Sequence, residues 1–321
     1  MYANDVAIDI QNLVKIYHPR SAPPVRALDG LTLQVRRGEI FGILGKNGAG
    51  KTTLLRILTT LLLPTSGEVT LLGYDVRKNP TDIRKHLCVV LQENAVEIYL
   101  SVADNLDTYA RFHSIPRQEI SGRIAQVMEQ FGLTDYRNQK VIDLSGGLKR
   151  RVQVAKVFMV DKPLVFLDEA TTGMDPINKR ATLDAIRQQA RAGRTIVLTT
   201  HILEEAEELC DTIAIIDRGH CVAIGDLPKI KSLVAGAFDV TIVFETLSSS
   251  LLDDLRRLPL VRFSHAHTTV EATVRSTDLS ALEDLVHIAR REQVLHLEVR
   301  SATLEDVFLE LLGPEKQGHT R

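Results

Sequence analysis

The stretch from Gly45 to Thr53, G-K-N-G-A-G-K-T-T, constrains the fold of this chain more than any other feature of the sequence. It fits the pattern G-x-x-x-x-G-K-[ST], in which a glycine-rich turn joins a buried strand to a helix. Glycine has no Cβ atom, so successive backbone N–H groups can turn inward and surround an anion. The pattern predicts a phosphate-binding loop, with an ordinary glycine-rich turn as the alternative.

The segments on both sides of this loop agree with the prediction. Residues 39–44 form an apolar run typical of a buried parallel strand, and residues 52–58 read as a helix whose N-terminus favours phosphate. We expect Lys51 to direct a positive charge at the β- and γ-phosphates and Thr52 to ligate Mg²⁺. The candidate nucleotide-binding residues of the loop are Gly45, Lys46, Asn47, Gly48, Ala49, Gly50, Lys51, Thr52 and Thr53.

A pair of carboxylates follows a second buried strand. Residues 164–167, Leu-Val-Phe-Leu, place Asp168 and Glu169 at the carboxyl end of that strand, where parallel sheets bind their ligands. One carboxylate can hold Mg²⁺, a role that we assign to Asp168, and the next can polarise a water. A solvated acidic turn is the alternative, and the phosphate-binding loop upstream argues against it.

A second glycine turn, Leu144-Ser145-Gly146-Gly147, precedes a helical run over residues 148–158. Ser145 is a candidate N-cap, and the two glycines would let the backbone approach a ligand. Taken alone, the turn could be a simple helix cap. The chain has one carboxylate pair but two candidate phosphate-facing helix starts, so the second could serve the nucleotide of a partner subunit.

The order of these motifs along the chain resembles the ATP-binding cassette family. The resemblance covers roughly residues 8–226, and the motifs are jointly specific. It implies an α/β fold: a P-loop NTPase core with a helical insertion at about residues 93–157. It also implies that the chain binds and hydrolyses ATP with Mg²⁺. The motifs that carry it are the phosphate-binding loop, Gln92, Leu144 to Gly147, Asp168-Glu169, Asp175 and His201.

The resemblance implies roles for single residues. Tyr17 matches the aromatic that stacks on adenine, although it could be a core aromatic. Gln92 matches a catalytic glutamine that touches Mg²⁺ or the attacking water and links to the membrane partner; it could also be a polar strand end. Glu169 matches the catalytic base. His201 matches the histidine that contacts the γ-phosphate, with a helix-cap residue as the alternative.

Further matches imply a head-to-tail dimer of two cassettes over two ATP. Ser145, Gly146 and Gly147 match the signature motif that reaches the γ-phosphate bound to the opposing subunit, and Asp175 matches a residue at the dimer seam. The family usually has glutamine after the second signature glycine, whereas this chain has Leu148. We interpret this as a variant that some export-type members share.

Four shorter segments narrow the resemblance to the ATPase subunits of daunorubicin-resistance type exporters. It implies a separate integral-membrane permease as partner, a second ATPase subunit (a homodimer), and a cytoplasmic position on the inner face of the cell membrane. Substrates in that group include drugs, lipids, polysaccharides and sodium, so the cargo stays open. The segments are residues 26–30, 37–42, 92–94 and 302–311.

Composition argues against other classes. Proteins that bind nucleic acid usually carry an excess of positive charge, whereas this chain has a net charge of −2. We therefore expect no nucleic-acid partner. The basic run Lys149-Arg150-Arg151 is interpreted as a solvated face or as contacts to phosphate-adjacent loops. Three scattered cysteines suggest a reducing cytosol. We expect neither a signal peptide nor a membrane span. The rivals are a cassette protein acting on ribosomes or DNA, and a binding module that has lost hydrolysis.

The pattern of predicted strands and helices changes after Leu227-Pro228. Segments between residues 238 and 299 read in the order β-α-β-β-α-β, which is ferredoxin-like, and a last helix covers residues 304–312. We therefore predict a nucleotide-binding domain over residues 1–227 and a small α+β accessory domain over residues 228–321. It would regulate the ATPase or steady a dimer, unless it merely caps apolar surface of the core.

Overall fold

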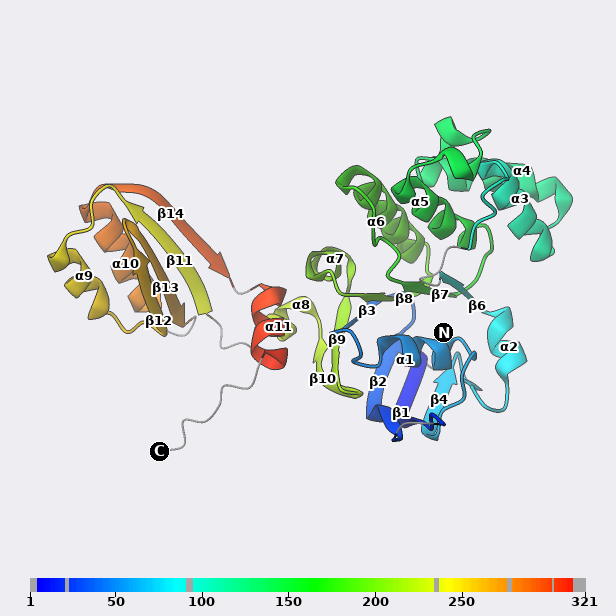
Figure 1. Cartoon of the computed structure of the whole chain (residues 1–321), viewed down its shortest axis with the longest axis horizontal. Coiled ribbons are helices and arrows are strands. Elements are labelled where there is room, and N and C mark those ends of the chain that lie inside the picture. The colour runs from blue at the N-terminus through cyan, green and yellow to red at the C-terminus, as the bar shows by residue number, and fades with distance from the viewer. Residues whose placement is uncertain are drawn as a thin grey trace. The chain divides into compact units, whose positions relative to one another are not determined.

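The computed structural model describes residues 5–20, 23–90, 95–233, 237–275, 279–301 and 303–313. The chain divides into two compact units, Met1–Asp226 and Leu227–Arg321, which are called here the N-terminal and the C-terminal unit (Figure 1). Two buried apolar clusters lie in the N-terminal unit and a third lies in the C-terminal unit, so each unit is described by itself.

A largely parallel sheet of six strands forms the centre of the N-terminal unit. Its strands are β3 (Ile40–Leu44), β6 (Leu87–Val90), β7 (Leu164–Asp168), β8 (Thr195–Thr200), β9 (Thr212–Asp217) and β10 (His220–Gly225). Their order is β10-β9-β3-β8-β7-β6, and only β10 runs antiparallel to its neighbour. Every residue of β3, β7 and β8 is buried, as expected of parallel strands covered on both faces.

A smaller antiparallel sheet packs on one side of the first helix. It consists of β1 (Val6–Tyr17), β2 (Val25–Arg36), β4 (Ser66–Leu71) and β5 (Tyr74–Asp75), in the order β2-β1-β4-β5. The apolar face of α1 (Lys51–Leu58) shares one buried cluster with this sheet and with one face of the central sheet. This cluster fixes the helix whose N-terminus holds the phosphate-binding loop.

Helices cover the opposite face of the central sheet (Figure 1). They are α3 (Val102–Phe112), α4 (Arg117–Gln130), the 3-10 helices Thr134–Tyr136 and Val141–Asp143, α5 (Gly146–Val157), α6 (Pro176–Arg191) and α7 (Leu203–Leu209). The predicted helical insertion is confirmed by α3, α4 and α5, which pack on one another. In the described part of the chain, no helix combines the length and the apolar character needed to cross a membrane.

Several short elements of the N-terminal unit, among them α2 (Pro80–Lys85) and β10, are not predicted by any pattern in the sequence. The six-residue helix α2 is too short to display a helical period, although Pro80 stands at a favoured first position. Strand β10 pairs with β9 through a tight hairpin in which Arg218 (φ 46°) and Gly219 (φ 83°) are both left-handed. Two such residues in a row are typical of a type I′ turn.

The C-terminal unit has the predicted ferredoxin-like order. Its elements are α8 (Leu227–Lys231), β11 (Ala237–Phe244), α9 (Ser249–Arg256), β12 (Arg262–Ala266), β13 (Thr269–Arg275), α10 (Leu279–Arg291), β14 (Val294–Ser301) and α11 (Leu304–Leu312). The sheet order is β12-β13-β11-β14, and all neighbouring strands are antiparallel. Thr303 and Asp306 form a capping box that fixes the start of α11.

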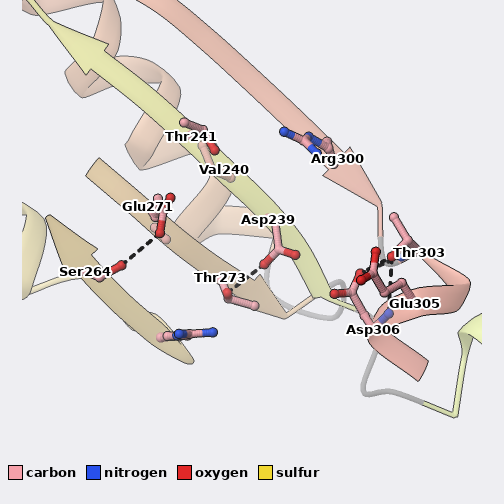
Figure 2. A pocket seen from close by; sticks show the side chains of 12 residues that line it. Asp239, Val240, Thr241, Ser264, Glu271, Thr273, Arg300, Thr303, Glu305 and Asp306 are labelled. Carbon is pink, nitrogen blue, oxygen red and sulfur yellow. Dashed lines mark hydrogen bonds between the residues drawn. The ribbon is translucent and has the colours of Figure 1, made fainter. Parts of the chain in front are cut away.

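The two faces of the C-terminal sheet differ. Helices α9 and α10 pack on one face and bury the apolar side chains of β11 and β13. The other face is polar and lines a hollow of about 300 Å³ (Figure 2). There the Thr273 hydroxyl donates a hydrogen bond of 2.7 Å to the Asp239 carboxylate on the neighbouring strand.

Candidate functional site

The phosphate-binding loop has the glycine geometry that the sequence predicts. Gly50 stands at the N-cap of α1 with φ 110°, and a Cβ atom added there would lie 2.6 Å from the Ala27 carbonyl oxygen. A Cβ atom at Gly45 would lie 2.3 Å from the Ile216 carbonyl oxygen. Both contacts are too short for any larger residue, so the loop backbone can take this path only with glycine at these positions.

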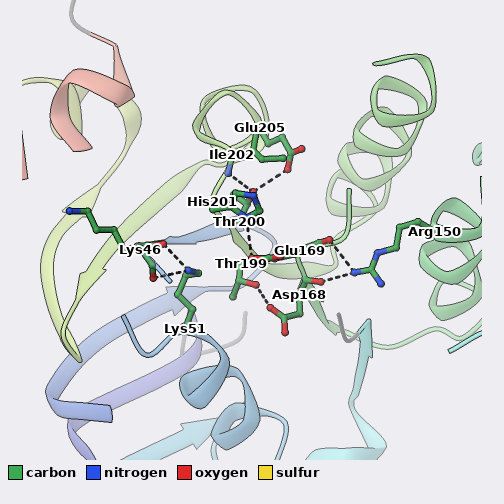
Figure 3. Close-up of polar contacts among 11 residues, drawn as sticks. Lys46, Lys51, Arg150, Asp168, Glu169, Thr199, Thr200, His201, Ile202 and Glu205 are labelled. Atoms are coloured by element: carbon green, nitrogen blue, oxygen red, sulfur yellow. Dashed lines mark hydrogen bonds and ion pairs between the residues drawn. The ribbon is translucent and has the colours of Figure 1, made fainter. Parts of the chain in front are cut away.

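Lys51 lies over this loop. Its Nζ atom donates to the carbonyl oxygens of Gly45 (2.7 Å) and Lys46 (3.1 Å), and only 7% of the residue is exposed (Figure 3). Burial lowers the pKa of the ammonium group, while the nearby charges of Glu169 and Asp168 raise it. A buried ammonium held by carbonyl oxygens is a prepared counter-charge for an anionic ligand.

The two carboxylates at the end of β7 have different surroundings. Asp168 is buried and accepts a hydrogen bond from the Thr199 hydroxyl on the adjacent strand β8. Glu169 has a left-handed backbone with φ 48°. Its Oε1 atom lies 3.0 Å from Nδ1 of His201, at the end of β8 (Figure 3). His201 is not the cap of α7, because the N-cap is Ile202.

One cavity of about 360 Å³ joins Glu169 to the phosphate-binding loop. Glu169 lines it together with the phosphate-binding loop, more than a hundred residues upstream in sequence. Tyr17 is half-buried beside the loop, with its hydroxyl 3.3 Å from the Thr53 hydroxyl, so it is not a core aromatic. The lining residues are Ala27, Asn47, Gly48, Gly50, Lys51, Thr52, Thr53 and Glu169.

Arg150 connects the second glycine turn to the carboxylate turn. It lies on α5 and donates to the carbonyl oxygens of Asp168 (2.7 Å), Glu169 (3.0 Å) and Ala170 (3.1 Å). Its remaining nitrogen donates to Oε1 of Gln153 at 2.9 Å. Burial lowers the pKa of the guanidinium, and the charges of Asp168 and Glu169 raise it. The arginine therefore holds the backbone that presents Glu169.

The basic run is thus not a solvated face at two of its three positions. Arg150 and Arg151 are both buried, and Arg151 donates to the carbonyl oxygens of Phe131 and Gly132. Contact with a phosphate-adjacent loop, the other interpretation, holds for Arg150. No local signal in the sequence marks these arginines as buried, because their acceptors are backbone carbonyls from distant segments.

The second glycine turn and Asp175 lie side by side. The Ser145 hydroxyl accepts from the Leu148 backbone N–H, which confirms the predicted N-cap of α5. A Cβ atom added to Gly147 would lie 3.3 Å from a carboxylate oxygen of Asp175. Asp175 in turn caps α6, and hydrogen bonds from Asn178 lower the pKa of its carboxyl group. None of the turn from Ser145 to Gly147 lines the cavity at Lys51.

The remaining predicted residues occupy different positions. The Lys46 and Ala49 backbones shape the loop: the Ala49 N–H donates to the Lys46 carbonyl and the Ala49 carbonyl accepts from Gly219. Gln92 lies outside the described residues, as do its neighbours from Leu91 to Asn94. Asn105, which the sequence does not single out, holds the following segment through hydrogen bonds to both backbone groups of Glu97.

The donor set fits a magnesium nucleotide. A loop in which Gly45 and Gly50 leave no room for a Cβ atom, a buried Lys51 ammonium and the N-terminus of α1 together suit phosphate oxygens. The Thr52 hydroxyl and the Asp168 carboxylate are hard oxygen ligands of the type that Mg²⁺ prefers. When bound, the ion would neutralise charge on the phosphates and orient them.

Comparisons with known proteins agree with this site. A family model described as "ABC transporter" matches residues 28–172. The daunorubicin/doxorubicin resistance ATP-binding protein DrrA of Streptomyces peucetius is 36% identical over 96% of this chain and 92% of the relative. The Nod factor export ATP-binding protein I of Rhizobium meliloti (strain 1021) is 34% identical over 97% of this chain and 89% of the relative. The solved structure of an ATP binding subunit of an ABC transporter aligns with a TM-score of 0.63 at 27% identity, over 71% of this chain and 92% of that one.

Proposed function

The chain belongs to the ABC transporter family, and we propose that it is the subunit that binds and hydrolyses MgATP to drive export through a separate membrane permease. One observation carries the proposal. The cavity at Lys51 brings the phosphate-binding loop and Glu169 together, and Nδ1 of His201 lies 3.0 Å from the Glu169 carboxylate. A phosphate anchor beside a carboxylate base is the arrangement that phosphoryl transfer to water requires.

Each residue has a defined task in this proposal. Tyr17 supports the adenine beside Thr53, and Lys51 neutralises the β- and γ-phosphates. Glu169 accepts the proton of the attacking water, and His201 holds the Glu169 side chain and contacts the γ-phosphate. These steps need positioned charges more than covalent chemistry, because phosphoryl transfer is dominated by positioning and electrostatic stabilisation.

Magnesium would be held by Thr52 and Asp168, with Gln92 as a further ligand. The first two stand at the start of α1 and the end of β7, and the Thr199 hydroxyl orients the Asp168 carboxylate. That hydrogen bond leaves the other carboxylate oxygen for the ion.

A second copy of an ATPase subunit completes the site. Ser145, Gly146 and Gly147 form a capped helix start that does not line the cavity of its own chain. We assign them, with the adjacent Asp175, to the γ-phosphate side of ATP bound by the other subunit. Arg150 would then connect the turn that senses one nucleotide to the base that acts on the other.

The permease would dock on the helical insertion. Large apolar side chains are exposed there: Tyr99, in the segment before α3, is 73% exposed, and Phe112, at the end of α3, is 85% exposed. Such side chains are typical of a surface that a partner covers. The chain would then act at the cytoplasmic face of the membrane, and the permease would select the cargo.

The hydrolytic role is tested with Glu169→Gln. Removing the base should preserve ATP binding, stop turnover and accumulate an ATP-bound dimer, which gel filtration with ATP detects. Glu204→Gln on α7 is the matched control, since Glu204 is exposed and does not line the cavity. Wild-type hydrolysis by Glu169→Gln would remove Glu169 from the base role.

The shared site is tested with mixed subunits. Lys51→Ala and Ser145→Arg chains should each be inactive alone, whereas their mixture should regain hydrolysis, because one of its two composite sites is intact. Full cooperative hydrolysis by either variant alone would rule out a shared site.

Docking is tested by co-purification. Tyr99→Glu and Phe112→Glu should each lose the permease and transport while the isolated chain still binds ATP. Val222→Glu, which alters an exposed apolar residue of β10, should keep both. Retained permease binding in both docking variants would contradict this assignment.

A further inference from the structure

The sheet of the C-terminal unit has two edge strands, and they are built differently. Edge β12 is five residues long, and its apolar residue Phe263 packs onto the core. Edge β14 is eight residues long and carries Leu295, Leu297 and Val299, which are 70%, 39% and 43% exposed. A long edge with an uncovered apolar row is a template for pairing with another strand.

The apolar row results from where the two helices pack. Their buried side chains cover β11 and β13, whereas only Val294 of β14 packs against that cluster. In the register with β11, Leu297 lies opposite Ile242 and Val299 opposite Val240, so both lie on the helix side of the sheet, where they stay 39% and 43% exposed. Leu295 is the extra residue of a β-bulge at the start of the strand.

The other face of β14 is charged and ordered. Arg300 lies 3.0 Å from the Glu298 carboxylate, and His296 lies 3.7 Å from it. Side chains alternate between the two faces along the strand. From His296 to Arg300 the strand therefore alternates charged and apolar side chains, with a basic group on each side of one acid.

We propose that β14 is a self-association surface, on which β14 of a second copy of this chain pairs antiparallel with Leu297 at the centre. In that register Leu297 faces Leu297, Leu295 faces Val299, and His296 faces Glu298 of the second copy. Apolar side chains meet apolar ones on the helix side, and opposite charges meet on the open face. An antiparallel strand pair of this kind is two-fold symmetric, as most homodimer contacts are.

Other registers of the same pair are less favourable. A register centred on Glu298 places two like charges directly opposite each other, and one centred on His296 places two histidines together. A register centred on Val299 matches Glu298 with Arg300 but overlaps the strands by fewer residues and sets Leu297 against Ser301. A slip by one residue turns the apolar row toward the charged face.

This surface is independent of nucleotide, so its test does not depend on the proposed ATPase role. The full-length chain is oxidised without ATP, and disulfide formation is read by non-reducing electrophoresis. Residue 297 faces itself across the pair, and directly opposed strand residues have Cα atoms within disulfide range. Leu297→Cys alone should therefore cross-link two copies.

Cysteine variants at two further positions of β14 test the register of the strand pair. Leu295→Cys and Val299→Cys should cross-link poorly alone and about fivefold or more better when mixed, because each faces the other. Ser264→Cys on edge β12 and the unaltered chain, with its three cysteines, are the controls. Cross-linking of Leu297→Cys no stronger than that of Ser264→Cys, or a product with a different protein, would overturn the proposal. Equal self-cross-linking at all three β14 positions would overturn the register and hence the proposal.

A charge exchange gives a second, reversible readout. Glu298→Lys places a lysine opposite His296 and should weaken dimerisation about tenfold in sedimentation equilibrium. Adding His296→Glu to the same chain restores opposite charges across the pair and should recover most of that loss. A double variant no better than Glu298→Lys alone would contradict pairing of these two positions.

Discussion

The two units contain the same hydrogen bond, from a threonine hydroxyl to an aspartate on the neighbouring strand, in different surroundings. In the N-terminal unit the Thr199 hydroxyl donates to Asp168 on the neighbouring strand, and in the C-terminal unit the Thr273 hydroxyl donates to Asp239 in the same way. The first pair is buried inside the nucleotide site (Figure 3), and the second lies on an open sheet face (Figure 2). The two pairs therefore differ in burial: one belongs to the nucleotide site, and the other lies at the protein surface.

The contrast extends beyond these pairs. Among the described residues, every buried polar or charged side chain lies in the N-terminal unit. Burying a charge costs free energy unless partners compensate it, and three of the five buried charges, Lys51, Arg150 and Asp168, lie at the nucleotide site. In the C-terminal unit the described core is apolar, which is typical of a domain that contributes an interaction surface. The buried charges are Lys51, Arg150, Arg151, Asp168 and Glu205.

The largest effect should come from Lys51→Ala. Removing the buried ammonium takes away the charge that faces the phosphates, so the affinity for MgATP should fall about 100-fold or more, as for a charge-assisted contact of roughly 3 kcal/mol. Equilibrium binding of a fluorescent ATP analogue measures it. Arg262→Ala, which removes an exposed charge beside the hollow of the C-terminal unit, should leave binding unchanged; a comparable loss there would break the contrast.

Arg150→Met should lower kcat about 10- to 100-fold with little change in KM, because it frees the backbone that presents Glu169 rather than the phosphate contacts. Arg150→Lys should recover part of the rate, since lysine can still donate to one or two of the carbonyls. Arg291→Met, which removes an exposed arginine paired with Asp254, is the control in the other unit. Equal changes in kcat and KM would indicate general damage instead of lost positioning.

The paired threonines sharpen the comparison directly. Thr199→Val leaves the buried Asp168 without this donor and should reduce the free energy of unfolding by about 1–3 kcal/mol. Thr273→Val, at the exposed pair, should cost less than about 0.5 kcal/mol. Urea denaturation followed by circular dichroism measures both. Similar losses at the two sites would show that burial is not the deciding variable.

The smallest effect on ATP binding should come from removing the C-terminal unit. A chain that stops before Pro228 should bind MgATP within about twofold of the full chain, since the described cavity lining ends at Glu169. It should lose self-association or coupling to the permease. A folded truncated chain that cannot bind ATP would refute the accessory role.

Local patterns predicted the parts of the fold that local chemistry determines. The glycine loop, the N-cap at Ser145 and the helices α10 and α11 follow from backbone freedom, a side-chain acceptor and a 3.6-residue period. The pairing of His201 with Glu169 was not predicted, because it depends on β7 and β8 being neighbours in the sheet, which no spacing in the sequence shows. The sequence allowed a contact of Arg150 with a phosphate-adjacent loop but not its burial or its acceptors, because these are carbonyls of Asp168, Glu169 and Ala170 that converge only in the folded chain.

The left-handed backbone of Glu169 also has a consequence for how this protein would change under selection. A residue with a Cβ atom pays about 1 kcal/mol for that conformation, which glycine and asparagine adopt more readily. In a library sorted for heat resistance alone, variants with glycine or asparagine at this codon should become enriched. In a library sorted for turnover, they should disappear. The residue found at position 169 after many generations would therefore show whether selection had favoured heat resistance or turnover.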